Sequence, residues 1–258
     1  MPRGSRLADD AWRALVPAAE PPAARFDPES LTDLPAPAQR FLRRALPEQT
    51  PLVDSVAVTA LGSIRLGSTW WAFHSAQVLR AGQGLVWRAR VRRGLLRIDG
   101  ADSYVGGTAR LDFRLYRLVP VVREHGPDID RSAAGRLAAE TVAWLPQSLA
   151  PQAGMRWEPI DDEHALATVV TPAGPIRVQV GVDADGRLRS IRTMRWNSAS
   201  SPPGRQAFGG SIDAEFRSQT GIRVAGSGSI GWGFGTDDWP DGLFFHFQLT
   251  STEYPASK

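Results

Sequence analysis

The sequence contains no cysteine, and its one lysine stands at position 258. Without cysteine the chain has no disulfide framework, no thiolate nucleophile, no lipid anchor on cysteine and no cysteine-based metal site. Histidine is scarce as well, and no two of the four lie at the spacing of a metal-binding pair (His74, His125, His164, His246). We therefore expect neither a metal ion nor another cofactor.

Long apolar runs are also missing. The longest, such as residues 118–122, are far too short for a membrane-spanning helix, which needs roughly 20 apolar residues. The N-terminal residues lack the apolar segment of a secretory signal. These observations predict a cytoplasmic protein with no integral membrane segment.

The charges form no concentrated block of either sign. Basic residues number 30 and acidic residues 27, and the arginines are scattered among the carboxylates. A nucleic-acid surface usually shows a clustered basic stripe, so we expect no nucleic-acid partner. The 258 residues are 42% hydrophobic, which is enough for a sizeable core. We predict one domain over residues 31–258, preceded by a Pro- and Ala-rich arm or partly disordered tail over residues 1–30.

Apolar residues alternate with polar ones over most of the chain, which is the period of β-strands. Residues 53–122 predict an antiparallel meander of five strands, and further strands follow from residue 155 to residue 254. Asp185-Gly186, between two alternating runs, is a strong hairpin signal. The pattern predicts a mainly β protein with one large curved antiparallel sheet, or half-barrel, of about eleven strands.

Two helices interrupt this pattern, at about residues 35–46 and 132–145. In the second, helical spacing places Leu137, Thr141 and Leu145 on one apolar stripe. Asp130 or Ser132 could cap its start, and Pro146 ends it. Because a large curved sheet must close or be covered, we expect this central helix to lie on the concave face.

Aromatic residues recur at characteristic spacings over residues 31–254. The motifs are Leu34-Pro35-Ala36-Pro37 before Phe41-Leu42, Trp70-x-x-Phe73-x-Ser75-x-Gln77, Trp87-Arg88-Ala89, Gly135 to Glu140 before Trp144-Leu145-Pro146, Trp157-x-x-Ile160-Asp161, the hairpin Val182 to Gly186, and Arg195. This pattern resembles an uncharacterised bacterial protein family, a domain of unknown function. The family is similar to the half-barrel of periplasmic lipoprotein carriers, a curved antiparallel sheet with helices over its open face. The resemblance implies a hydrophobic cavity and no particular chemistry.

The candidate site consists of aromatic and polar residues that would face such a cavity. Plain core packing is the alternative for each tryptophan, although Trp70 and Trp71 must face opposite sides of one strand. Gln77, on the same face as Trp71, could hydrogen-bond a ligand carbonyl or satisfy backbone groups. The predicted ligand-binding residues are Trp71, Phe73, Gln77, Trp87, Trp144, Trp157, Arg195 and Trp196.

Two sets of charged residues each allow two interpretations. Glu140 beside apolar surface could act as a general acid or base, because burial raises a carboxyl pKa. It could equally form an ion pair with Arg136 or with a strand arginine. The alternating arginines of residues 88–93 predict a solvated sheet face, with an anionic headgroup or phosphate site as the alternative.

The leading functional hypothesis is therefore a protein that binds a hydrophobic or lipid-like small molecule between the curved sheet and the central helix. An alternative is a cofactor-independent enzyme, of cyclase or isomerase type, that uses Glu140 as acid and base in the same cavity. A third possibility is an interaction module without a cavity, which would show an exposed apolar patch on the sheet. Whether the protein is an enzyme stays open at this point.

Overall fold

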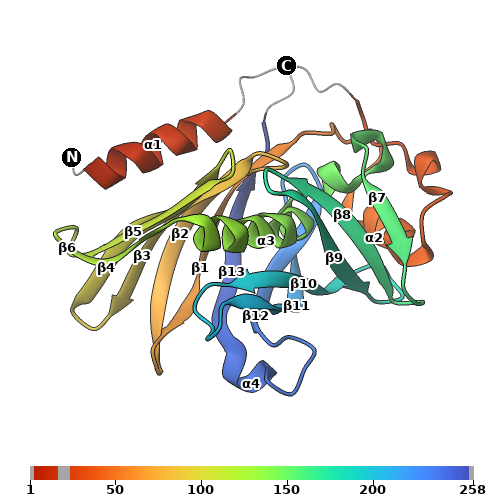
Figure 1. The fold of residues 1–258 in the computed structure, drawn as a ribbon. Coiled ribbons are helices and arrows are strands. Elements are labelled where there is room, and N and C mark those ends of the chain that lie inside the picture. The colour runs from red at the N-terminus through yellow and green to blue at the C-terminus, as the bar shows by residue number, and fades with distance from the viewer. Residues whose placement is uncertain (1–2, 17–23, 256–258) are drawn as a thin grey trace.

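A single antiparallel sheet holds the two halves of the chain together (Figure 1). The computed structural model describes residues 3–16 and 24–255. The strands are β1 (Ser55–Leu66), β2 (Thr69–Arg80), β3 (Gly84–Arg93), β4 (Leu96–Val105), β5 (Thr108–Leu115), β6 (Val119–His125), β7 (Arg156–Pro159), β8 (His164–Thr171), β9 (Gly174–Val182), β10 (Leu188–Asn197), β11 (Gly204–Arg217), β12 (Arg223–Trp232) and β13 (Leu243–Glu253). The helices are α1 (Arg3–Leu15), α2 (Ala36–Ala45), α3 (Pro127–Trp144) and α4 (Trp239–Gly242), with short 3-10 helices at Pro28–Leu31, Pro146–Leu149 and Pro151–Ala153. The predicted mainly β class, with a large curved sheet and a covering helix, is confirmed.

The strand order explains why α3 crosses the molecule. The order is β6-β5-β4-β3-β2-β1-β13-β12-β11-β10-β9-β8-β7. From β1 at the centre the chain adds strands outward to the β6 edge, and α3 then carries it across the concave face to the β7 edge. Strands β7 to β13 lead back to the centre, where β13 pairs with β1 in a register that places Ala57 opposite Glu253. The helix is thus the connection between two meanders.

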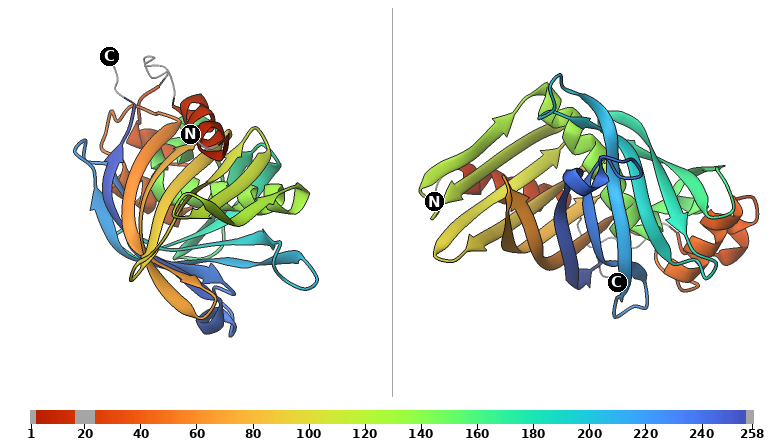
Figure 2. Two further views of the ribbon diagram at one scale, coloured as in Figure 1. Left: turned by 90° about the vertical axis from the view of Figure 1, so that its left-hand side faces the viewer. Right: turned by 90° about the horizontal axis from the view of Figure 1, so that it is seen from below.

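The sheet is strongly curved (Figure 2), and irregular pairing accompanies the curvature. The register shifts between Thr59 and Ala60 at the β1–β13 pairing, and near Ile212 at the β11–β12 pairing. Such bulges bend a strand and increase its twist. Gly62 of β1 allows the close approach of β13, because a Cβ atom there would collide with the carbonyl oxygen of His246.

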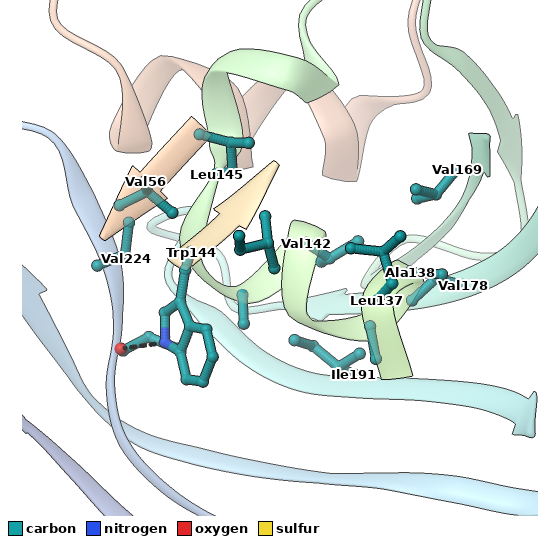
Figure 3. Close-up of a cluster of buried hydrophobic side chains, with 14 of the residues drawn as sticks. Val56, Leu137, Ala138, Val142, Trp144, Leu145, Val169, Val178, Ile191 and Val224 are labelled. Carbon is teal, nitrogen blue, oxygen red and sulfur yellow. Dashed lines mark hydrogen bonds between the residues drawn. The ribbon is translucent and has the colours of Figure 1, made fainter. Parts of the chain in front are cut away.

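Helix α3 packs its apolar stripe against one wall of the half-barrel. Leu137, Ala138 and Val142 are fully buried, and Figure 3 shows them beside a wall of strand residues (Val169 of β8, Val178 of β9, Ile191 of β10). The helix ends where predicted, because Leu145 leaves the helical conformation and Pro146 cannot continue it.

The predicted start of this helix is wrong. The helix begins at Pro127, five residues before the expected position, and its N-cap is Gly126 without a side-chain hydrogen bond. Proline suits a first helical turn because its missing N–H would have no partner there. Asp130 does not cap the helix: it accepts a 2.6 Å hydrogen bond from the backbone N–H of Ala109 and so joins α3 to β5.

The first half of the chain contains six strands where five were predicted. The expected strand ending near residue 122 is split by a tight turn at Tyr116-Arg117. The sheet has 13 strands in all, where about eleven were predicted. Both turn residues have left-handed backbone angles, φ 49° and 64°, which hairpin turns usually assign to Gly, Asn or Asp. The Tyr116 hydroxyl donates a 2.9 Å hydrogen bond to the carbonyl of Leu95 in the neighbouring hairpin.

Helices α1 and α2 lie away from the concave centre. Leu15 of α1 is buried against Val78 and Val86 on the convex face. The disorder expected for the N-terminal arm does not describe residues 3–15, which are helical; residues 1–2 and 17–23 lie outside the described residues. Buried residues of α2 join the core at one end of the half-barrel. In the described part of the chain, no helix combines the length and apolarity needed to cross a membrane.

Candidate functional site

A mostly apolar cavity of about 360 Å³ lies between α3 and the concave face of the sheet. Four of its lining residues are charged, namely Asp102, Arg136, Glu140 and Arg195. The others are nearly all apolar, and seven are aromatic. These aromatic residues are Trp87, Phe113, Trp144, Phe208, Phe244, Phe245 and Phe247. The volume falls within the range of small-molecule sites.

Some predicted site residues line this cavity, and two lie directly behind its wall. Trp87, Trp144, Arg195 and Glu140 are lining residues. Phe73 and Gln77, both buried on β2, support them from behind. Phe73 stacks on Phe245 at a ring-centre distance of 4.8 Å and meets Trp87 edge-on at 5.9 Å.

Three predicted residues do not line the cavity. The Trp157 indole Nε1 donates a 3.0 Å hydrogen bond to the carbonyl of Leu149 and thereby fixes the segment after α3. The Trp196 ring lies 4.6 Å from the guanidinium carbon of Arg131. Trp71 is half-buried and packs against the main core. A high aromatic content in the sequence does not by itself show which of these side chains faces a cavity.

The lining residues that sequence reasoning missed come mainly from β13. Phe244, Phe245 and Phe247 line the cavity, and Phe113 of β5 joins them. The run of phenylalanines at the start of β13 was the available signal. It did not indicate a cavity because the partner strands of β13 are β1, distant in sequence, and β12.

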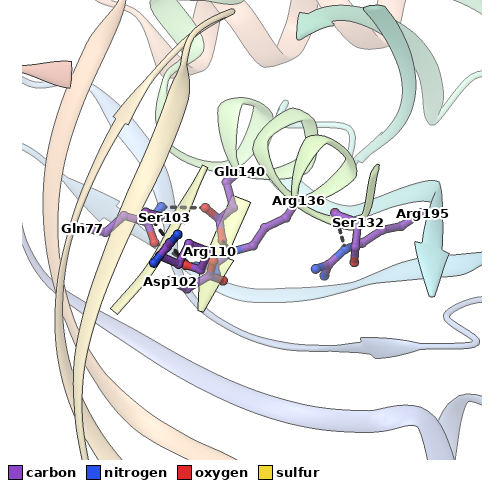
Figure 4. Close-up of polar contacts among 8 residues, drawn as sticks. All are labelled: Gln77, Asp102, Ser103, Arg110, Ser132, Arg136, Glu140 and Arg195. Carbon is purple, nitrogen blue, oxygen red and sulfur yellow. Dashed lines mark hydrogen bonds and ion pairs between the residues drawn. The ribbon is translucent and has the colours of Figure 1, made fainter. Parts of the chain in front are cut away.

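A closed polar network surrounds Arg136 beneath the helix (Figure 4). Its Nε donates to Glu140 Oε1 at 2.7 Å, Nη1 to Asp102 Oδ2 at 2.5 Å and Nη2 to Gln77 Oε1 at 3.1 Å. Gln77 Nε2 donates in turn to Glu140 Oε2 at 2.6 Å. Both carboxylate oxygens of Glu140 therefore accept hydrogen bonds. The ion pair between Glu140 and Arg136 is the one that the sequence suggested.

The network keeps Arg136 charged. Burial would lower the pKa of its guanidinium group, but the opposite charges of Glu140 and Asp102 outweigh burial and raise the pKa above its ordinary value. The network also ties α3 to β2 and β4. It therefore fixes the helix over the sheet by hydrogen bonds in addition to apolar contact.

Arg195 lines the same cavity in a different environment. Its Nε donates a 2.9 Å hydrogen bond to the carbonyl oxygen of Ser132 on α3. Its guanidinium carbon lies 4.4 Å from the ring centre of Phe208 and 5.2 Å from that of Trp232. Burial and then repulsion from Arg136 lower the pKa of Arg195 to about 10. The group is still charged at neutral pH.

The arginine stripe of β3 lies on the convex face, in a second hollow of about 850 Å³. Arg88 pairs with Asp9 of α1 at 2.8 Å, and Arg90 pairs with Asp99 at 3.1 Å. The hollow is rich in charged groups that pair with one another. These contacts agree with the interpretation of the stripe as a solvated sheet face.

No metal site emerges among the described residues, where no group of three or more His, Asp or Glu side chains is placed to hold an ion. His246, one of the four histidines, stacks on Trp70 at 4.7 Å and shares a 2.9 Å hydrogen bond with Ser229. The acid–base role considered for Glu140 stays a prediction.

Comparisons with known proteins give a family and several distant structural neighbours. A model of DUF6544, described as a family of unknown function, matches residues 24–243. No curated protein matches the chain.

The solved structures that match share little sequence with the chain. A domain classed as an outer membrane lipoprotein-sorting protein domain, from Vibrio parahaemolyticus, is 9% identical with a TM-score of 0.43, over 86% of this chain and 92% of that one. A DUF1329 family protein from Desulfovibrio piger is 9% identical with a TM-score of 0.42, over 87% and 95%. A LolA superfamily protein from Nitrosomonas europaea is 9% identical with a TM-score of 0.42, over 85% and 92%.

Proposed function

The chain belongs to the DUF6544 family of unknown function, and we propose that it binds an apolar or lipid-like small molecule in the cavity beneath α3. The observation that carries the proposal is the cavity of about 360 Å³ whose lining is apolar except for four charged side chains. Small-molecule sites typically combine such a lining with a few fixed polar groups. The tight network around Arg136 supplies polar groups whose positions are fixed.

The geometry supports binding better than proton transfer. A general acid or base needs a lone pair or proton directed at the substrate. Glu140 instead directs one oxygen at Arg136 and the other at Gln77. The alternative of a cofactor-independent enzyme that uses Glu140 therefore gains no specific support from the site.

An interaction module without a cavity also fits less well. Exposed apolar side chains do gather at neighbouring hairpin tips, where Leu95 is 93% and Leu118 is 77% exposed. Leu95 and Leu118 lie in turns, however, whereas the apolar side chains of the proposed site gather in a cavity between α3 and the sheet. The cytoplasmic location expected from the sequence stays a prediction, which cell fractionation of the protein at its natural level would test.

Filling the cavity tests the proposal directly. Ala139 and Ala143 of α3 line it, so Ala139→Leu and Ala143→Leu place apolar atoms in the open space without removing any contact. We expect the double variant to keep the fold and to lose binding of dodecanol, measured by displacement of a fluorescent apolar probe. Ala173→Leu, at an exposed turn, is the matched control.

Chain length gives an independent measurement. Each buried CH2 group contributes about 0.8 kcal/mol, so removing one from an n-alcohol should weaken binding about fourfold in the unmodified protein. Organic extraction and native mass spectrometry of the purified protein would identify a ligand that co-purifies. Equal binding of short and long alcohols, or full binding by the filled variant, would contradict the proposal.

A further inference from the structure

Arg195 is the one charged lining residue of the cavity that has no ionic partner among the described residues. Arg136 pairs with both Asp102 and Glu140 at 2.5 and 2.7 Å. For Arg195 the one hydrogen bond found in this part of the chain joins Nε to the Ser132 carbonyl. The two terminal nitrogens, Nη1 and Nη2, are thus without a protein partner in the described structure.

The guanidinium group is held firmly in this position. Gly135 of α3 lies directly over Arg195, and a Cβ atom there would be 2.8 Å from the Arg195 Cγ. The neighbouring rings of Phe208 and Trp232 lie against the guanidinium group, and the Ser132 carbonyl accepts the hydrogen bond from Nε. Figure 4 shows the guanidinium group pointing under the helix, towards the side of Arg136.

A cation without an ionic partner in a mainly apolar cavity is only partly hydrated, and this is unfavourable. Removing a charge from water costs free energy unless an opposite charge or a hydrogen-bond partner replaces the water. The depressed pKa of about 10 reflects this cost, to which burial contributes most and Arg136 next. An anion between the Nη atoms would remove it, because the planar fork of arginine matches a carboxylate or phosphate with two parallel hydrogen bonds.

We propose that the ligand is an amphiphile with one anionic head, a carboxylate or phosphate, which Arg195 binds through Nη1 and Nη2. The inference rests on the proposed function and adds the class of ligand to it. The apolar chain lies along the aromatic wall that includes Phe245 and Trp87, which line the same cavity. The network of Arg136, Glu140 and Asp102 is already internally paired, so the head docks beside it and does not need to break it.

The test compares ligands that share a chain and differ in the head. Dodecanoate, dodecyl phosphate, dodecanol and dodecylammonium are titrated against the unmodified protein at pH 7, below their micellar concentrations, by displacement of a fluorescent apolar probe. A hydrogen bond to a charged group contributes about 1.5–3 kcal/mol. We therefore expect dodecanoate or dodecyl phosphate to bind about 10- to 150-fold more tightly than dodecanol, with dodecylammonium weakest.

Two variants assign the preference to Arg195. Arg195→Met keeps length and apolar contact and should remove the preference for the anionic heads while dodecanol still binds. Arg192→Met is the matched control, because Arg192 lies on the same strand and points to the other face of the sheet. It should leave the preference unchanged. If Arg195→Met fails to fold, the relative affinities of the four ligands for the unmodified protein still show whether the site prefers an anionic head.

The outcomes separate the inference from the proposed function. Binding of dodecanol with no gain for the anionic heads leaves an apolar site and overturns the role of Arg195. Preference for dodecylammonium also overturns it, and would point to the buried Oδ1 of Asp102, which has no hydrogen-bond partner among the described residues. If none of the four ligands binds, the proposed function fails and the inference falls with it.

Discussion

Arg136 is the centre of a group of charged side chains that are mostly buried. Arg136 and Glu140 are only 17% and 16% exposed, and Asp102 is 15% exposed. Burying charges is favourable only when the partners are well placed, and removing one partner leaves the others uncompensated. Removing one member of the network should therefore lower the stability by more than the loss of its own hydrogen bonds.

We expect Arg136→Met to lower the free energy of unfolding by about 3–5 kcal/mol, because Glu140 and Asp102 would stay buried without a counter-charge. Arg177→Met is the control: Arg177 pairs with Glu158 at 2.6 Å, but both are more than half exposed. Exposed pairs contribute about 0–1 kcal/mol. Urea unfolding of both variants measures the difference, and similar losses would show that the Arg136 network is not a buried charge cluster.

Asp99 on the convex face gives a pH-dependent counterpart. Burial alone would raise the pKa of its carboxyl, but hydrogen bonds from Arg97 at 2.6 Å and Arg90 at 3.1 Å outweigh burial and hold the pKa below its ordinary value. The folded chain therefore favours the ionised form. The resulting stability is present above the unfolded-state pKa of about 4 and is lost as the pH falls through the folded-state pKa.

Asp99→Asn should accordingly lower the free energy of unfolding at pH 7, and the difference from the unmodified protein should shrink below about pH 4. Urea unfolding of both proteins at a series of pH values measures it. A difference of the same size at pH 7 and at strongly acidic pH would mean that the hydrogen-bonded charge of Asp99 is not its cause.

At the scale of the element, the hairpin of β5 and β6 has two residues other than glycine in left-handed backbone conformations, and other contacts partly offset the cost. Tyr116 and Arg117 occupy left-handed backbone conformations at φ 49° and 64°, each of which costs a residue other than glycine roughly 1–2 kcal/mol. Tyr116 gains a hydrogen bond to Leu95 from its position. Arg117 gains only a 3.8 Å contact with Asp99, from a side chain that is 66% exposed.

Replacing Arg117 with glycine should therefore stabilise the protein, by about 1 kcal/mol, because the relief of backbone strain exceeds the loss of an exposed ion pair. Tyr116→Gly should gain less or lose stability, since it also removes the hydroxyl that bonds to Leu95. Thermal or urea unfolding compares the two. Equal gains would mean that the Tyr116 hydroxyl contributes nothing.

The same hairpin shows why strands were easier to predict than their ends. Asp185-Gly186 predicted the β9–β10 hairpin correctly, because the turn requires a left-handed conformation that glycine accepts. Gly186 has φ 79°. Tyr116-Arg117 has no such turn signal, so β5 and β6 were predicted as a single strand. The early start of α3 was missed for a similar reason, since Gly126-Pro127 usually indicates a loop.

At the scale of the whole molecule, the sequence predicted the curved sheet and the covering helix but only part of the site. Alternation along a strand shows which residues share a face, so Trp87 and, on the helix, Trp144 could be assigned to the interior. It does not show which distant strand lies alongside. Phe245 reached the cavity wall through the pairing of β13 with β1, and such non-local pairing leaves no local pattern.

The sheet also separates two apolar clusters, one on each of its faces. The large cluster lies on the concave side around α3, whereas Leu15 of α1 joins Val78 and Val86 in a small cluster on the convex side. Because the small cluster buries few residues, α1 should open locally at a lower free energy than the sheet unfolds.

Leu15→Ala removes the anchor of that cluster. We expect hydrogen exchange of the α1 amides to accelerate strongly, while the amides of α3 and the binding of dodecanol stay close to those of the unmodified protein. Leu137→Ala is the matched control, since Leu137 is as deeply buried but belongs to the concave cluster. It should lower the global free energy of unfolding by about 2–5 kcal/mol and accelerate exchange throughout the sheet. If Leu15→Ala instead destabilised α3 and weakened binding, the two faces of the sheet would have to be one cooperative unit.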